Sequence, residues 1–267
     1  MTAPNRSGDA GRRACRVWVR CYAELNDLLP PDRRHVEFPV DLDVGPSVKD
    51  LIEGVGVPHT EVDLVLVDGE PVDFSHPVRD GDRVSVYPVF ESIDVGPVTR
   101  VRPEPLRETR FVLDTHLGRL ARYLRLVGFD ADYERERSDD ELATTSRSEG
   151  RILLTCDRGL LKRSAVTHGY LVRERRPRAQ LLEVVHRFDL GRRLTPFTRC
   201  LACNGLLRDA TPSEVATRVP ASVRWRYERY RTCPRCGRVY WQGSHHARLA
   251  RIVDDVRRSA GRPDRPG

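Results

Sequence analysis

Two short apolar runs in the middle of the chain each lead to an aspartate, and this pattern suggests metal chemistry. Asp114 directly follows residues 111–113, and Asp157 lies three residues after residues 152–154. The runs are typical of buried strands, and the strands of a parallel sheet place their carboxyl ends at one edge. Carboxylates crowded at that edge stay ionised only if a cation neutralises them, and hard oxygen ligands suit Mg²⁺ or Mn²⁺. Two such ions about 4 Å apart can promote phosphodiester cleavage.

A third acidic cluster lies between these two aspartates. Asp139, Asp140 and Glu141 follow Ser138, and the spacing of Ser138 and Glu141 is that of a helix capping box. Acidic residues favour a helix N-terminus for electrostatic reasons alone, so capping explains this cluster as well as metal binding does. A single aspartate after a strand is also often only a turn residue.

Four cysteines form the strongest motif in the sequence. They lie in two C-x-x-C pairs separated by 29 residues, namely Cys200 with Cys203 and Cys233 with Cys236. Each pair can chelate a metal from one turn, and thiolates need a cation to neutralise them, so we predict tetrahedral Zn²⁺. Four protein ligands leave no open position, which makes the predicted zinc structural. The alternative is a set of free or redox-active thiols.

Arginines alternate with aromatic residues between the two cysteine pairs. Residues 224–231 read Arg-Trp-Arg-Tyr-Glu-Arg-Tyr-Arg. This composition suits single-stranded RNA, because bases stack on aromatic rings while guanidinium groups bind phosphates. Packing of Trp225, Tyr227 and Tyr230 inside a small ribbon explains the aromatic residues equally well.

Hydrophobic periodicity supplies the elements that would hold these residues. We expect strands at 111–113, 151–155 and 170–173, and helices at 139–148 and 160–166. Further helices are expected between Asp114 and Gly128 and from Pro177 onwards, since glycine suits the end of a helix and proline its first turn. Strands that alternate with helices predict a mostly parallel sheet covered on both faces.

Three arginines recur at every third position of the helix after Asp114. They are Arg119, Arg122 and Arg125, and they predict a basic stripe on the helix face opposite the apolar one. Such a stripe is either a phosphate-binding surface or a solvated helix face.

The first hundred residues predict a smaller α+β roll. Strands are expected at 16–22, 63–67 and 83–89, with a helix at 48–55 that Ser47 would cap. This order resembles ubiquitin-like β-grasp folds of the sulfur-carrier type. Those carriers end in a free Gly-Gly tail, whereas this chain continues past residue 93, so we expect docking to a protein partner and not thiocarboxylate chemistry.

The net charge of +7 hides an asymmetry between the two parts of the chain. Residues 1–99 carry 10 Lys and Arg against 18 Asp and Glu, and residues 100–267 carry 36 against 21. A basic part attracts polyanions such as RNA, although it can also serve solubility alone. No secretory signal and no apolar run of about 18 residues occur, so we expect a cytoplasmic protein without membrane contact.

Two longer segments resemble the Mut-seven C-terminal RNase family. They are FVLDTHLGRLARYLRLVGFD and GRILLTCDRGLL, and the resemblance covers about residues 110–250. It implies an α/β fold in which a PIN-like three-layer α/β/α nuclease domain with a parallel sheet precedes a zinc ribbon and follows the ubiquitin-like β-grasp domain. The expected parts are a disordered leader (1–14), the β-grasp domain (15–93), a linker (94–109), the nuclease domain (110–195), the zinc ribbon with the C-terminal helix (196–258) and a disordered tail (259–267).

The same resemblance implies roles for individual residues. Asp114 and Asp157 take the place of catalytic Mg²⁺- or Mn²⁺-binding residues, and we choose Asp140, with Asp139 beside it, from the middle cluster. Family members usually carry arginine before the second aspartate, where this chain has Cys156, so one phosphate contact is lost. The predicted substrate-binding residues are Arg119, Arg122, Arg158, Lys162, Arg224, Trp225 and Arg226.

Two functions follow from these expectations. The first is a metal-dependent, PIN-like endoribonuclease whose substrate is RNA and whose structural zinc ribbon aids RNA binding. The second is a non-catalytic adaptor that binds RNA or ribosomes and keeps only a vestigial acidic pocket.

Overall fold

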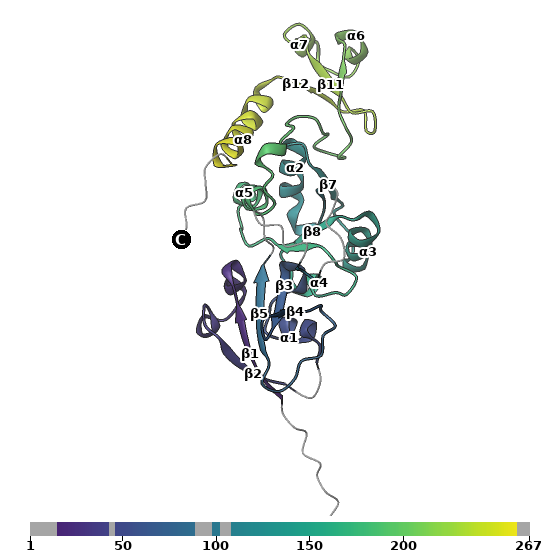
Figure 1. Cartoon of the computed structure of the whole chain (residues 1–267). Helices are drawn as coiled ribbons and strands as arrows, with labels where there is room; N and C mark the ends of the chain where they lie inside the picture. The colour runs from purple at the N-terminus through teal and green to yellow at the C-terminus, as the bar shows by residue number, and fades with distance from the viewer. Residues whose placement is uncertain (1–14, 43–45, 89–97, 102–107, 261–267) are drawn as a thin grey trace, which may run out of the picture. The chain divides into compact units, whose positions relative to one another are not determined.

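The computed structural model describes residues 15–42, 46–88, 98–101 and 108–260, and the chain divides into two compact units (Figure 1). The N-terminal unit comprises residues 1–105 and the C-terminal unit residues 106–267. The leader expected at 1–14 lies outside the described residues, as do most of the expected linker and tail. Among the described residues, no helix has the length and apolar character needed to cross a membrane.

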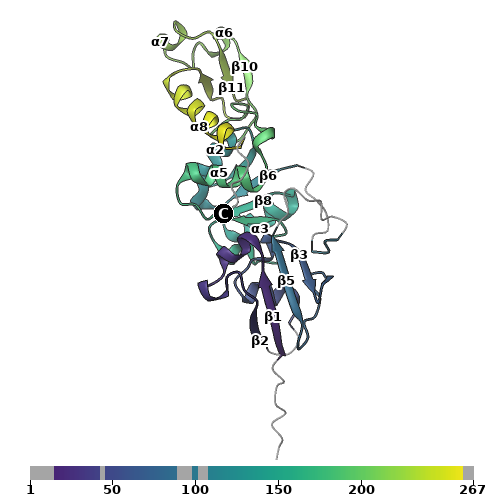
Figure 2. The same cartoon turned by 60° about the vertical axis from the view of Figure 1, so that its left-hand side comes forward.

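The N-terminal unit is built on a mixed five-stranded sheet with strand order β2-β1-β5-β3-β4. Its main elements are β1 (Cys15–Cys21), β2 (Phe38–Leu42), α1 (Val48–Gly54), β3 (Val62–Val67), β4 (Glu70–Pro71) and β5 (Arg83–Pro88), with 3-10 helices at Ala23–Leu28, Pro31–Arg33 and His59–Glu61. β1 alternates buried and exposed residues and pairs in parallel with β5, as the view in Figure 2 shows. A capping box between Ser47 and Asp50 starts α1. The α+β roll expected from the sequence is present.

A four-stranded parallel sheet forms the centre of the C-terminal unit. Its strands are β6 (Arg110–Leu113), β7 (Asp130–Tyr133), β8 (Ile152–Thr155) and β9 (Gly169–Leu171), in the order β7-β6-β8-β9. From β6 the chain runs first to β7, which pairs with one edge of β6. It runs later to β8, which pairs with the other edge of β6. The carboxyl ends of β6 and β8 therefore flank a topological switch point, where α/β sheets commonly bind ligands.

Helices cover both faces of this sheet. Between the strands lie α2 (Gly118–Leu126), α3 (Asp139–Glu149) and α4 (Arg158–Leu161), and α5 (Pro177–Arg187) follows β9. In Figures 1 and 2, α2 and α5 lie on one side of the sheet and α3 on the other. The result is the three-layer α/β/α arrangement that the alternating pattern predicts. Short 3-10 helices occur at Thr115–Leu117 and Gly191–Arg193.

A small antiparallel ribbon follows the three-layer part. It contains β10 (Arg208–Ala210), α6 (Pro212–Val215), α7 (Ala221–Arg224), β11 (Tyr230–Thr232) and β12 (Val239–Trp241), and α8 (Ser244–Ala260) completes the described chain. α8 returns to pack beside α5, where it buries Ile252, Val253 and Val256 in the same core as the sheet (Figures 1 and 2).

Several boundaries differ from the expected ones for identifiable reasons. The short helix α4 starts at Arg158 and not near residue 160, because the Asp157 side chain caps its first turn. β9 ends at Leu171, because a carboxylate oxygen of Glu183 accepts the N–H of Arg173 at 2.8 Å. The expected basic stripe is also divided: Arg125 is only 3% exposed and does not share the solvent-facing surface of Arg119 and Arg122.

Candidate functional site

One threonine joins the two aspartates at the switch point. The hydroxyl of Thr155, the last residue of β8, donates to Oδ2 of Asp114 at 2.7 Å and accepts the backbone N–H of Asp157 at 2.9 Å. Thr155 is fully buried and Asp114 is 8% exposed, while Asp157 is exposed. The carboxyl ends of β6 and β8 are thus connected by a single side chain.

Each aspartate also caps the turn that follows its strand. Oδ1 of Asp114 accepts the N–H of His116 at 3.3 Å, and Oδ1 of Asp157 accepts the N–H of Gly159 at 2.7 Å. Turn capping therefore accounts for one oxygen of each carboxylate. Because each aspartate caps the turn after its strand, each one follows an apolar run in the sequence.

The environment of Asp114 favours its ionised form. Burial acts to raise the pKa of this carboxyl group, but hydrogen bonds from Thr155, Thr115 and His116 outweigh burial and hold the pKa below its ordinary value. The carboxylate is therefore negatively charged at neutral pH, as a ligand for a hard cation must be.

The middle acidic cluster is engaged by an arginine and by helix capping. The guanidinium group of Arg163 forms an ion pair with Asp140 and lies 3.7 Å from a carboxylate oxygen of Asp139. Glu141 and Ser138 form the capping box of α3. Within the described ranges, the group of three or more Asp, Glu, His or Cys residues placed to hold a metal is the cysteine cluster. The structure therefore brings together Asp114 and Asp157 through Thr155, but it does not gather Asp139 or Asp140 with them as a ligand set.

Basic side chains line a pocket of about 630 Å³ next to Asp114. Two of them, Arg119 and Arg122 on α2, are predicted substrate-binding residues, and both are exposed. Arg135 and Arg175 line the same pocket but were not predicted, because they lie in irregular segments after β7 and β9 where no periodic pattern marks them. Thr115 and His116, the residues after Asp114, form part of its wall.

Two other predicted contact residues flank Asp157. Arg158 is the exposed first residue of α4, and Lys162 is the half-buried residue that ends this helix. Their positions add positive charge beside the switch point.

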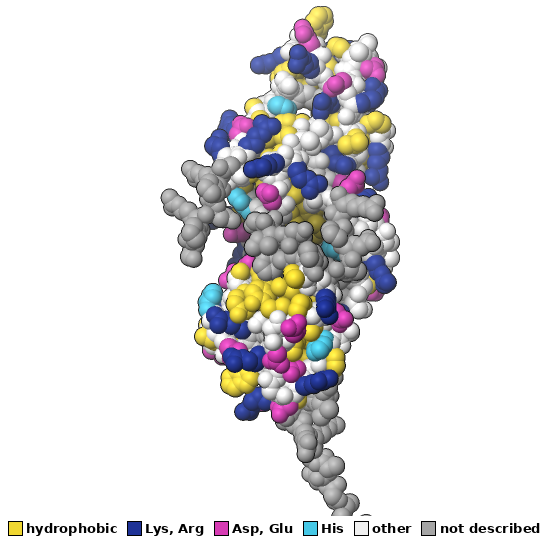
Figure 3. Space-filling view, in the orientation of Figure 1, with side chains coloured by type: hydrophobic (Ala, Val, Ile, Leu, Met, Phe, Trp, Pro, Cys, Tyr) yellow, Lys and Arg dark blue, Asp and Glu magenta, His cyan; other side chains and the backbone are white. Residues whose placement is uncertain are grey.

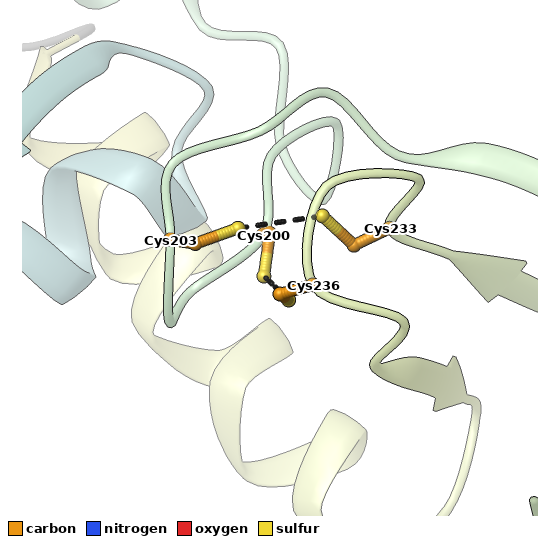
Figure 4. A group of neighbouring side chains, drawn as sticks. All are labelled: Cys200, Cys203, Cys233 and Cys236. Carbon is orange, nitrogen blue, oxygen red and sulfur yellow. Dashed lines mark hydrogen bonds between the residues drawn. The ribbon is translucent and has the colours of Figure 1, made fainter.

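The four cysteines converge on one point (Figure 4). Their sulfur atoms all lie within 4.8 Å of one another, with Cys203 and Cys233 at 3.4 Å and Cys200 and Cys236 at 3.6 Å. A tetrahedral site with Zn–S bonds of about 2.3 Å requires sulfur separations of about 3.8 Å, so the cluster has the size and the donor chemistry for zinc. Gly205 allows the two pairs to approach, because a side chain there would meet the sulfur of Cys233.

The thiols of this cluster have divergent acidities. Burial acts to raise the pKa of Cys200, but a hydrogen bond from Tyr240 and neighbouring backbone N–H groups lower it to about 6. Burial raises the pKa of Cys203 to about 12. Such a crowded thiol group cannot fully ionise by itself, and a divalent cation would relieve the repulsion.

The first cysteine turn is fixed to the parallel sheet. Buried Arg125 of α2 donates to the carbonyl oxygens of Leu201 and Ala202 at 3.3 and 2.9 Å. The side chain of Asn204 accepts the N–H of Ala131 in the edge strand β7 and donates to Asp130. This turn therefore covers part of an otherwise open sheet edge, and Arg125 has a structural role.

The aromatic residues of the ribbon divide into two groups. Tyr230 is 2% exposed and packs with Val215 and Val219, with Tyr227 against this small core. Trp225 is 91% exposed, and its neighbours Arg224 and Arg226 are exposed as well. Packing thus explains the tyrosines but leaves the tryptophan and its flanking arginines facing solvent at the C-terminal end of α7.

Comparisons with known proteins agree with this architecture. The N-terminal residues 14–94 match the model of the Mut7-C ubiquitin domain. Solved structures similar to the chain include a Pyrococcus furiosus protein provisionally described as molybdopterin converting factor subunit 1 (27% identity, TM-score 0.24, 28% of this chain and 99% of that one). Another is SAMP1 from Haloferax volcanii (18% identity, TM-score 0.24, 29% of this chain and 99% of that one). No curated protein matches the chain.

The larger match lies in the C-terminal unit. Residues 109–253 match the model of the Mut7-C RNAse domain, and they include the parallel sheet, both aspartates and all four cysteines. This match covers more than half of the chain and agrees with the resemblance noted from the sequence. The chain belongs to the Mut7-C RNAse domain family and carries a Mut7-C ubiquitin domain before it.

Proposed function

We propose that the chain is a metal-dependent ribonuclease whose centre lies at the carboxyl ends of β6 and β8. The observation that carries this proposal is the link through Thr155 between Asp114 and Asp157 at the switch point. Membership of an RNAse domain family supplies the reaction class. The active site would follow the PIN-like pattern and cleave RNA internally.

Asp114 and Asp157 would hold Mg²⁺ or Mn²⁺. Proteins commonly bind Mg²⁺ through one or two carboxylates, with substrate phosphate and water completing its octahedral coordination, so a pair of aspartates is sufficient. The bound metal would supply Lewis acidity and an activated water for phosphodiester hydrolysis. Thr155 would keep the Asp114 carboxylate in place, and Asp140 or Asp139 would join only if the contact with Arg163 opens.

The basic surface of the C-terminal unit would bind the RNA strand. Lys and Arg side chains are spread over this unit in Figure 3. Arg158 and Lys162 lie beside the aspartates, and Trp225 with its flanking arginines offers an exposed ring on which a base can stack. The cysteine cluster would hold structural zinc and fix the position of the ribbon relative to the parallel sheet. The ubiquitin-like unit would bind a protein partner.

The proposal is tested by cleavage of a labelled single-stranded RNA with Mg²⁺, with Mn²⁺ and without added divalent ion. We expect cleavage that requires the metal. The variants Asp114→Asn and Asp157→Asn should each lower kcat/KM by about 100-fold or more, because charge is removed where it is needed in the transition state. Asp254→Asn, a substitution of an exposed aspartate on α8, is the matched control and should retain full activity. Persistent cleavage by the double variant Asp114→Asn, Asp157→Asn would exclude this centre.

A non-catalytic RNA-binding adaptor is the second candidate. The ion pair of Arg163 with Asp140 favours it, because that carboxylate is already neutralised by the protein. The same assay separates the two functions when RNA affinity is measured alongside cleavage. An adaptor binds the RNA and leaves it intact with every metal, whereas the nuclease shortens it.

A further inference from the structure

Four arginines line the pocket beside Asp114. Arg119 and Arg122 reach it from α2, Arg135 from the segment after β7 and Arg175 from the segment after β9. No acidic residue is among the side chains that line it. In the described part of the chain, none of these four guanidinium groups has a hydrogen bond or an ion pair with another residue.

Other arginines of the same unit are neutralised by carboxylates. Arg137 pairs with Asp132 at 2.5 Å, and Arg151 pairs with Asp130 at 2.6 Å. The pocket therefore concentrates cations that the protein leaves uncompensated. Four like charges around one hollow raise its electrostatic potential, which a bound anion would lower.

Backbone groups add to the attraction for an anion. The pocket includes Gly118, the first residue of the nine-residue helix α2, together with Thr115 and His116 just before it. The N-cap residue Leu117 makes no side-chain hydrogen bond to the first turn of α2, so no capping side chain offsets the positive end of this helix. Free N–H groups and the helix dipole favour negative charge at this end.

The pocket is held in shape by hydrogen bonds behind its wall. Glu183 of α5 accepts the N–H groups of Arg173 and Glu174 at 2.8 and 3.0 Å, and Gln180 donates to the carbonyl of Glu174 at 2.9 Å. These contacts fix the backbone that leads directly into Arg175. On the other side, the hydroxyl of Tyr133 donates to the carbonyl of Thr115 at 3.0 Å. A wall fixed in advance lowers the entropic cost of binding.

The number of arginines indicates which anion fits. An internal phosphodiester carries a single negative charge, whereas a phosphomonoester carries about −1.5 to −2 at pH 7 and offers three acceptor oxygens. Four guanidinium groups suit the second, since each can donate two parallel hydrogen bonds. The volume of about 630 Å³ lies within the range of small-ligand sites.

We propose that this pocket binds the terminal phosphomonoester of an RNA strand. The pocket shares Thr115 and His116 with the surroundings of Asp114, so the anchored end lies next to the proposed cleavage centre. Only the link to cleavage rests on the proposed ribonuclease function. Recognition of the phosphate itself does not.

The test compares the affinities of three RNA decamers that carry a 5′-phosphate, a 3′-phosphate or no terminal phosphate. Binding is measured by fluorescence anisotropy with a label on an internal base. The buffer contains neither added Mg²⁺ nor Mn²⁺ and no chelator, so the cysteine cluster keeps its zinc and cleavage does not interfere. We expect about tenfold tighter binding of one phosphorylated decamer, and the favoured one identifies the strand end.

Charge removal should abolish this preference. The double variant Arg122→Gln, Arg175→Gln should bind all three decamers with equal affinity, whereas Arg147→Gln on exposed α3 should keep the tenfold difference. Equal affinity of the wild type for the three decamers would overturn the proposal.

A second measurement needs no variant: adenosine 5′-monophosphate or 3′-monophosphate, but not adenosine, should displace the favoured decamer. Equal displacement by adenosine would also overturn it. If the wild type prefers one phosphorylated decamer but does not cleave RNA when Mg²⁺ or Mn²⁺ is added, the nuclease function alone is refuted.

Discussion

Thr155 is buried, and both of its hydrogen bonds reach residues of the proposed cleavage centre. It donates to the carboxylate of Asp114 and accepts from the backbone of Asp157. Threonine rather than serine suits this place, because its methyl group fills core space while the hydroxyl remains fixed. Thr155 positions the carboxylate of Asp114 and the backbone of Asp157, and it is not expected to touch the substrate.

Replacement of Thr155 by valine keeps the shape of the side chain and removes both hydrogen bonds. We expect kcat/KM to fall about tenfold with little change in KM, because the Asp114 carboxylate loses its orientation. Unfolding in urea should show a loss of about 1–2 kcal/mol for the unpaired buried groups. Thr155→Ser restores the hydroxyl and should recover the activity in steady-state assays. Full activity of Thr155→Val would show that the link is only structural.

Sequence patterns located some site residues and misplaced others. Asp114 and Asp157 could be found because they repeat one arrangement after two apolar runs. Arg135, Arg175 and Glu183 could not, because their importance depends on which loops meet above the sheet. Arg125 was predicted to share a basic stripe with Arg119 and Arg122, since spacing along a helix does not reveal that a distant cysteine turn covers one end of it.

Among the elements, β7 connects the sheet to the cysteine cluster. It is the edge strand of the parallel sheet, and the first cysteine turn binds it through Asn204 and Asp130. Half-buried Asp130 also pairs with Arg151. Partial burial acts to raise the pKa of Asp130, but its hydrogen bonds with Arg151 and Asn204 outweigh burial and lower the pKa. Order in the cysteine turn is thus transmitted to the sheet.

Removal of the first cysteine pair should therefore loosen β7 as well as the ribbon. For the double variant Cys200→Ser, Cys203→Ser, we expect hydrogen exchange to increase at least tenfold in Asp130–Tyr133, while β8 in the sheet centre stays protected. Mass spectrometry of peptides after exchange measures both. Cys156→Ser is the control, because this exposed cysteine lies outside the cluster. Unchanged exchange in β7 would show that the turn is independent of the sheet.

The apolar strands and amphipathic helices were predictable, whereas the short polar strands were not. β7 reads Asp-Ala-Asp-Tyr, and four residues that include two aspartates form too short and too polar a segment to indicate a strand. β2 contains Pro39, which is tolerated because β2 is an edge strand. The three strands of the ribbon are three residues long each, which is too short for any period to show.

At the scale of the whole molecule, charge is distributed unevenly between the two units. Residues 106–267 carry 34 Lys and Arg against 20 Asp and Glu, a balance of +14, whereas the whole chain has +7. The N-terminal unit therefore reduces the positive potential that attracts a polyanion over long distances.

A chain that begins at residue 106 should bind RNA more tightly than the full chain. We expect about threefold to tenfold stronger binding at low salt and a smaller difference at high salt, because screening removes long-range effects. Anisotropy titrations at several salt concentrations measure this. A difference that persists at high salt would point to direct occlusion of the RNA-binding surface instead.

The placement of the four cysteines has a mechanical consequence. One pair lies in the turn that binds the edge strand of the sheet, and the other pair lies in the turn between β11 and β12. The proposed zinc would therefore connect the parallel sheet to the antiparallel ribbon. Oxidation of the four thiols would release the proposed zinc, and the ribbon would then lose this covalent connection to the sheet.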